Sequence, residues 1–346
     1  MRWRQGVEVP SEASQQTDDR CGTAFTFPVF MQLHGAPVAE PSVPLPSPLP
    51  PYGIDGYRKP YCDAGYPDSN ATADAQHTLR WHGMWAWRRA HGSAGTPVNL
   101  ASVGDVSQQN WNGNYTTLYP QQGNDFPRSY LLLPVNETLA QAATPGAWRG
   151  GVNVTALRQA ELQAYGFYAY MKHSAPGALA DRITLVRNST LAAGTQHGLT
   201  KLPYVRDTRR AVGLDGYQAQ ADTLHAAMPD RIAIVEYGFD VHRMDCTYPP
   251  YVVHPTVSSG RLYVPLRALL VGGVDNMLVA GKTLAQSFLV ASTTRLHPGE
   301  WATGLAAGVT AALLAQHNLT TTQALSGPET ASIQRAILSQ GGVIDW

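Results

Sequence analysis

The chain has 346 residues, enough for one large domain or two medium ones, and its 44% hydrophobic and 9% aromatic residues are typical of a folded globular protein rather than a disordered one. Its 25 basic and 25 acidic residues cancel, which argues against nucleic acid or an anionic membrane as the main partner. The longest apolar stretch, residues 305–315, is far too short to span a bilayer, so no membrane partner is expected.

Six Asn-X-Ser/Thr triplets occur in the chain, where chance would give roughly one or two in a sequence of this composition. They indicate a glycosylating secretory pathway or an extracellular location, with coincidence in a Thr-rich sequence as the alternative. The N-terminal residues lack the apolar core of a secretory signal, so we expect that signal upstream of this sequence. The triplets begin at Asn70, Asn114, Asn136, Asn153, Asn188 and Asn318.

The three cysteines, Cys21, Cys62 and Cys246, allow at most one intrachain disulfide and have none of the spacings of a metal site. We therefore expect no metal, and the cysteines alone do not decide between an oxidising and a reducing compartment.

The first hundred residues have weak secondary-structure signals. Residues 23–33 predict a strand interrupted by Pro28, and residues 37–51 predict an extended, proline-rich insertion because proline cannot continue a sheet ladder. Trp81 and Trp85 lie four residues apart, with Trp87 close by, which favours the buried face of a helix. A sugar-stacking surface is the alternative for these tryptophans.

Later segments have clearer periodicity. Residues 152–173 form the clearest predicted helix, with Asn153 as a candidate cap, and further helices are predicted at 300–315 and 330–340. Runs rich in β-branched and aromatic residues predict strands at residues 182–187, 231–236, 261–264 and 276–280.

The span from residue 263 to residue 315 carries the strongest functional signal. A predicted strand leads through Gly281 and a polar stretch to a helix of small residues, in which Gly304, Ala307 and Gly308 share a face. A helix N-terminus carries a partial positive charge, and small residues let a neighbour approach closely. A flavin ring and an ordinary packed helix are both compatible with this pattern.

Several ordered motifs resemble the FAD-dependent oxidoreductase family. The C-terminal motifs run from Tyr263 to Leu270, Val274 to Lys282, Thr294 to Pro298 and Gly304 to Gly308. Upstream, Tyr204 to Arg210 is similar to the arginine-rich signature of the family's substrate domain. The resemblance covers about residues 95 to 346 and implies FAD as the cofactor and a small-molecule substrate.

The resemblance implies an α/β fold, a partial Rossmann-like FAD/NAD(P)-binding domain with a sheet-rich substrate domain. No Gly-X-Gly-X-X-Gly turn occurs in the sequence, so we expect the N-terminal βαβ unit that binds the FAD pyrophosphate to be missing and the chain to be a truncated, weak or inactive oxidoreductase. The expected divisions are a substrate or cap region at 1–255, the end of the FAD domain at 256–320 and a helical tail at 321–346.

The resemblance also assigns candidate cofactor-binding residues. It places the first three at the end of a strand, near the ribityl and phosphate groups of FAD. It places the next three beside the isoalloxazine ring, and the last three on the helix that approaches the ring. In chain order these are Ala280, Gly281 and Lys282, then Arg295, His297 and Pro298, then Gly304, Ala307 and Gly308. Relatives often have arginine where this chain has Lys282, which keeps the charge but loses the planar fork.

Two residues are candidate catalytic groups. His297 is a candidate acid or base because imidazole titrates near neutrality, with a structural role as the alternative. Arg210 is a candidate clamp for a substrate carboxylate or an oxyanion; alternatively it pairs with an acid such as Asp207 or Asp215 and braces the fold. Adjacent residues on a strand point to opposite faces, so at most one of Arg209 and Arg210 reaches the cleft.

The expected function is hydride or electron-pair transfer between an organic substrate and FAD. One alternative is a non-catalytic secreted binding module with a tryptophan-rich surface. A hydrolase is a second alternative, although the sequence has no Gly-X-Ser-X-Gly or His-Glu-X-X-His motif. The sequence identifies neither the substrate nor the oligomeric state.

Overall fold

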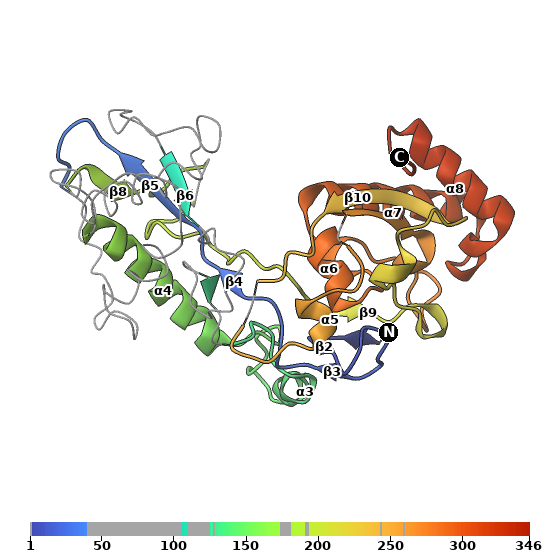
Figure 1. Cartoon of the computed structure of the whole chain (residues 1–346), viewed down its shortest axis with the longest axis horizontal. Coiled ribbons are helices and arrows are strands. Elements are labelled where there is room, and N and C mark those ends of the chain that lie inside the picture. The colour runs from blue at the N-terminus through green and yellow to red at the C-terminus, as the bar shows by residue number, and fades with distance from the viewer. Residues whose placement is uncertain are drawn as a thin grey trace.

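The computed structural model describes residues 2–39, 106–109, 125–126, 129–173, 181–190, 194–242, 244–258 and 260–346. These residues form two lobes joined by extended segments (Figure 1). Most of the proline-rich stretch 37–51, the three tryptophans Trp81, Trp85 and Trp87, Cys62, and two glycosylation triplets, at Asn70 and Asn114, lie outside the described residues.

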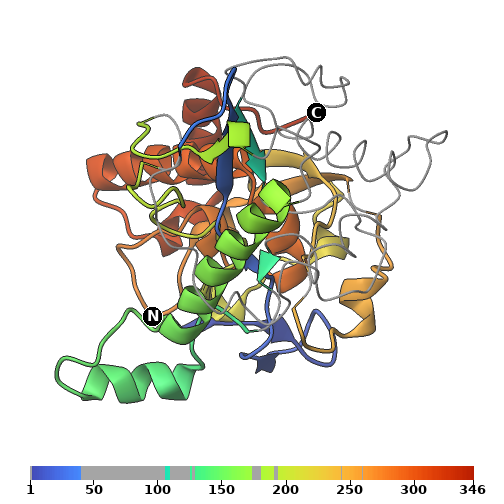
Figure 2. The same cartoon turned by 90° about the vertical axis from the view of Figure 1, so that its left-hand side faces the viewer.

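The first lobe is built on a three-stranded antiparallel sheet in the order β6-β5-β8, with β5 at Val29–Leu33, β6 at Val106–Gln109 and β8 at Ile183–Leu185. Helix α4 (Val154–His173) runs obliquely across this sheet, as Figure 2 shows. Alternate residues of β5 are buried against alanines and Phe167 of α4, because side chains alternate across a strand. The strand predicted at 23–33 is interrupted at Pro28, and its first half, β4 (Phe25–Thr26), pairs with β7 (Asp125–Phe126).

The second lobe is built on the antiparallel pair β10 (Arg231–Tyr237) and β11 (Gly260–Pro265). Helices α6 (Phe288–Thr294), α7 (His297–His317) and α8 (Gly327–Ser339) pack against β10. Both predicted C-terminal helices are therefore confirmed. The strand predicted at 276–280 is wrong: only the bridge between Leu270 and Leu278 forms among the described residues.

The N-terminal segment lies against the second lobe (Figure 1). Strand β1 (Trp3–Arg4) pairs with β9 (Arg210–Ala211), and β2 (Val7–Glu8) pairs with β3 (Thr17–Asp18). A disulfide joins Cys21 to Cys246 across 225 residues. The remaining short helices are α3 (Val135–Ala143), α5 (Pro250–Val253) and the 3-10 turns η3 (Leu214–Gly216), η4 (Ala221–Thr223), η5 (Leu266–Leu269), η6 (Gly281–Thr283) and η7 (Thr322–Leu325).

This mixture of helices and small antiparallel sheets fits an α/β FAD-type domain. The Rossmann-like detail and the divisions at residues 255 and 320 remain predictions, although β10, which precedes residue 255, shares a sheet with β11. Among the described residues, no helix combines the length and apolarity that crossing a bilayer requires.

Candidate functional site

Four separate segments of the chain meet at the start of α7. They are the loop that follows β10, the turn η6, the junction between α6 and α7, and the loop that precedes β9. The junction is defined by local sequence: Ser287 caps α6 by accepting a hydrogen bond from the Val290 amide at 3.0 Å, and Pro298 lies in the first turn of α7. Arg295 lies at this junction and is 3% exposed.

The guanidinium of Arg295 forms hydrogen bonds with residues of two of the other segments. Its Nη1 donates to the Tyr204 hydroxyl at 3.1 Å, and its Nη2 lies 2.5 Å from Asp240 Oδ2 and 3.1 Å from the Asp240 carbonyl oxygen. Charge-assisted contacts of this kind are about twice as strong as neutral hydrogen bonds. The predicted ring-contacting arginine is therefore held rigidly by the protein itself.

Asp240 is the acceptor that connects these groups. Besides Arg295, it has His242 Nε2 at 3.2 Å and accepts a hydrogen bond from the Tyr237 hydroxyl at 3.0 Å. Burial alone would raise the pKa of Asp240, but the hydrogen bond and charge of His242 and the charge of Arg295 outweigh it and hold that pKa well below its usual range. The carboxylate is therefore negatively charged throughout the physiological pH range.

The turn η6 is tied to the first turns of α7. Lys282 Nζ lies 3.1 Å from Glu300 Oε1 and 5.8 Å from the centre of the Tyr204 ring. The Gly281 amide donates to Thr303 Oγ1 at 3.0 Å. Gly281 has a φ of +58°, a left-handed conformation that glycine adopts at little cost, and this conformation lets the chain turn here.

The outer face of α7 is open among the described residues. His297 and Pro298 are exposed, and within the described part of the chain no side chain caps the N-terminus of this helix. Gly304 and Gly308 are also exposed, and a Cβ atom built on either would meet nothing within 4 Å, whereas Ala307 packs partly against the core. The glycines are thus not required for packing between α7 and any described neighbour.

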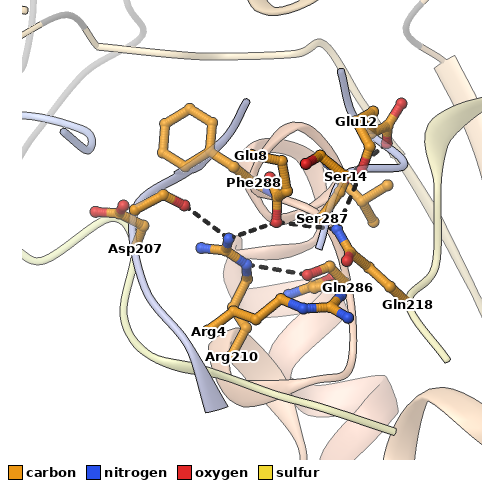
Figure 3. Close-up of polar contacts among 12 residues, drawn as sticks. Arg4, Glu8, Glu12, Ser14, Asp207, Arg210, Gln218, Gln286, Ser287 and Phe288 are labelled. Atoms are coloured by element: carbon orange, nitrogen blue, oxygen red, sulfur yellow. Dashed lines mark hydrogen bonds and ion pairs between the residues drawn. The ribbon is translucent and has the colours of Figure 1, made fainter. Parts of the chain in front are cut away.

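Arg210 lies in a buried ion pair at the start of α6 (Figure 3). Its Nη2 is 2.8 Å from Glu8 Oε1 and donates to the Gly6 carbonyl at 2.7 Å, and both ion-pair side chains are 0% exposed. Glu8 also accepts from Gln218 and from the Phe288 amide, both at 2.9 Å. This placement favours the bracing role for Arg210, with Glu8 as the partner instead of Asp207 or Asp215.

Asp207 is a second buried carboxylate, and it belongs to the arginine-rich signature from Tyr204 to Arg210. It accepts hydrogen bonds from the Tyr130 hydroxyl at 2.9 Å and from the Thr23 amide at 3.4 Å. Burial raises its pKa to about 6, although the Tyr130 hydrogen bond and the charge of Arg210 act in the opposite direction. We expect Asp207 to be at least partly protonated in mildly acidic solution.

Sequence reasoning missed two acidic residues, Asp240 and Glu8. The first has a local signal, because Asp240 lies two residues before His242, a possible partner for its carboxylate. No local pattern marks Glu8, whose partner is 202 residues away.

Comparisons with known proteins give one match. No curated protein and no solved structure is significantly similar to this chain. The model of the FAD dependent oxidoreductase family matches residues 80–337, a span that contains Tyr204, Asp240, Lys282, Arg295 and all of α7. Because this match covers well over half of the sequence, the chain belongs to the FAD dependent oxidoreductase family.

Proposed function

We propose that this chain contributes the ring-binding part of a site at which a small organic molecule exchanges a hydride or an electron pair with FAD. FAD is the cofactor that the family implies. The observation that carries the proposal is the uncapped N-terminus of α7, which has exposed glycines on its outer face and the fixed cation Arg295 directly before it.

The residues at this N-terminus fit the ring end of the cofactor. When bound, FAD supplies the two-electron chemistry, and its reduced ring carries negative charge near one edge. The free amides of a helix N-terminus and the Arg295 guanidinium both favour negative charge nearby. Lys282 adds a compact positive charge, which suits a phosphate or ribityl oxygen better than a bidentate partner.

The protein's own groups have separate roles in this proposal. Arg295 and Lys282 orient the cofactor, and the glycine face gives it room to approach α7. His297, exposed at the first position of the helix, is in a position to exchange a proton with solvent or substrate. The sequence has no glycine-rich turn for the pyrophosphate, so the proposal covers the ring end alone.

We expect the 346-residue chain to bind FAD more weakly than micromolar, and Gly304→Leu to weaken binding further by about tenfold to a hundredfold. Overpacking of a contact costs about 1–3 kcal/mol, which corresponds to this loss of affinity if only the bound state suffers. The free energy of unfolding should not fall, because a side chain at Gly304 meets no described atom and leucine has a higher helix propensity than glycine. Equilibrium dialysis and quenching of flavin fluorescence measure the affinity.

Ala315→Leu is the matched control. Ala315 is exposed on α7 eleven residues, or about 16 Å, beyond Gly304, so leucine there should leave the FAD affinity unchanged. If the parent chain bound FAD with submicromolar affinity, the expectation that it lacks the pyrophosphate-binding turn and therefore binds FAD weakly would be wrong. An equal effect of both leucine variants would contradict the placement of the ring.

We also propose that the protein is a secreted glycoprotein. The disulfide between Cys21 and Cys246 supports an oxidising compartment. Asn136, Asn188 and Asn318 are exposed, and the last two adopt the left-handed conformation that asparagine tolerates at turns. These three side chains have room for a glycan.

Asn153 is expected to stay unmodified. Its Oδ1 accepts from the Ala156 amide at 3.0 Å and its Nδ2 donates to Ser129 Oγ at 3.0 Å, so the amide caps α4 and points into the protein. In protein made in a eukaryotic secretory host, deglycosylation in ¹⁸O-water followed by peptide mass mapping should label Asn136, Asn188 and Asn318 but not Asn153. Labelling of Asn153 to the same extent, or of none of the four, would count against the proposal.

A further inference from the structure

We propose that Asp240 is a positioning residue: its carboxylate holds Arg295 and His242 in place at the start of α7. This inference rests on the proposed function, because it gives Asp240 a role in the same site. Asp240 itself need not touch the cofactor or the substrate, since its contacts are with the groups that surround the start of the helix.

The first argument is the distribution of hydrogen bonds. One oxygen, Oδ1, lies 3.2 Å from His242 Nε2, and the other, Oδ2, takes Arg295 Nη2 at 2.5 Å and the Tyr237 hydroxyl at 3.0 Å. Arg295 in turn donates to Tyr204 from its other terminal nitrogen. Asp240 is therefore the shared acceptor for side chains that come from the end of β10 and from the α6–α7 junction.

The second argument is that the backbone that carries Asp240 is itself anchored. The Asp240 carbonyl accepts from Arg295 Nη2 at 3.1 Å, and the His242 carbonyl accepts from the Ala24 amide at 3.0 Å. Four residues beyond His242, the disulfide from Cys246 to Cys21 joins the loop to the N-terminal segment. An anchored carboxylate can impose one orientation on a long, flexible arginine side chain.

The third argument is charge. The side chains of Arg295 and Asp240 are 3% and 13% exposed, so each needs the other to offset the loss of hydration. Without the carboxylate, Arg295 would lose the contact between its Nη2 and Asp240 Oδ2 and turn toward another acid. Asp207 is such an acid: burial raises its pKa to about 6, and the charge of Arg295 acts against that rise. The positive charge would then no longer be fixed at the start of α7.

The test compares Asp240→Asn with Asp230→Asn in the full chain. Asp230 is a buried carboxylate at the other end of β10, paired with Arg267 at 2.7 and 2.8 Å. Its replacement removes an ion pair on the same strand, although Arg267 is 45% exposed. We expect Asp240→Asn to weaken FAD binding by tenfold or more. Asp230→Asn should lower stability without changing FAD affinity by more than twofold.

A second measurement reports on Arg295 without FAD. The ¹⁵N resonances of its guanidinium, assigned through Arg295→Lys, should show slow rotation in the parent and in Asp230→Asn, and fast averaging in Asp240→Asn. An Asp240→Asn variant that keeps both the parent's FAD affinity and the slow rotation overturns the proposal. If the parent takes up no FAD, the proposed function fails and the guanidinium signal alone decides the positioning role.

If Asp240→Asn does not fold, Arg295→Lys takes its place in the affinity measurement. It keeps the charge but cannot contact Asp240 and Tyr204 together. An affinity within twofold of the parent overturns the proposal, because it would show that the joint contact of Arg295 with Asp240 and Tyr204 does not matter for binding.

Discussion

Replacing Arg210 with alanine is expected to lower the free energy of unfolding by about 3–5 kcal/mol, because the substitution leaves Glu8 charged, buried and without its cationic partner. Glu8 would retain hydrogen bonds from Gln218 and the Phe288 amide, but neither carries a compensating charge. Urea unfolding followed by circular dichroism measures the loss, with the slope of the transition as a check that the unfolding mechanism is unchanged.

The double variant Glu8→Met/Arg210→Met distinguishes the free-energy cost of an unpaired buried charge from the net contribution of the ion pair to stability. Apolar side chains of similar volume often replace a buried ion pair without loss, so the double variant should be much closer to the parent than Arg210→Ala is. Arg209→Ala is the control for the neighbouring arginine, which is partly exposed and hydrogen-bonded to Gln5 and Thr138. Equal stability of Arg210→Ala and the parent would refute the bracing role and return Arg210 to the list of catalytic candidates.

Removing the disulfide is expected to have an effect of similar size. Cys21 and Cys246 are 225 residues apart, and closing a loop of that length removes about 5 kcal/mol of chain entropy from the unfolded state in the simplest treatment, while typical measured values are 2–4 kcal/mol. We therefore expect Cys21→Ser/Cys246→Ser to lose about 2–5 kcal/mol of unfolding free energy. Guanidinium unfolding of the oxidised parent and the double variant measures the difference.

Two comparisons make the disulfide result specific. Reductant should destabilise the parent to the level of the double variant and leave the double variant unchanged. Cys62→Ser, which keeps the bonded pair, should unfold like the parent. A double variant as stable as the oxidised parent would mean that the bond constrains the unfolded chain far less than its loop length implies.

The parts of the fold that sequence reasoning found are those whose signals are local. The helix at 297–317 and strands β8, β10 and β11 follow from spacings of two to four residues. The prediction of a strand at residues 276–280 was wrong because a strand forms only when a second strand pairs with it, and an apolar run does not show whether such a partner exists. Arg209 and Arg210 have different partners, and the sequence does not predict which residue each contacts.

In the candidate site too, residues that belong to a local motif were predictable, whereas contacts between distant parts of the chain were not. Motif resemblance led to Arg295, Lys282 and the glycines of α7, all within about thirty residues of one another. It did not show that Arg295 is already engaged by Asp240, because that contact joins residues 55 positions apart through the packing of β10 against α6 and α7.

The pairing of the first residues with much later ones has a consequence for the nascent chain. Strand β1 pairs with β9 at residue 210, and Cys21 bonds to Cys246, so β1 and Cys21 cannot meet these partners until most of the protein has been synthesised. At about 5–20 residues per second, that delay lasts roughly 10–45 s. Once Cys62 has been made, Cys21 can bond to it instead, and such a wrong bond must be exchanged before Cys21 can join Cys246. Yield of correctly folded protein should therefore depend on a thiol-disulfide isomerase in the host.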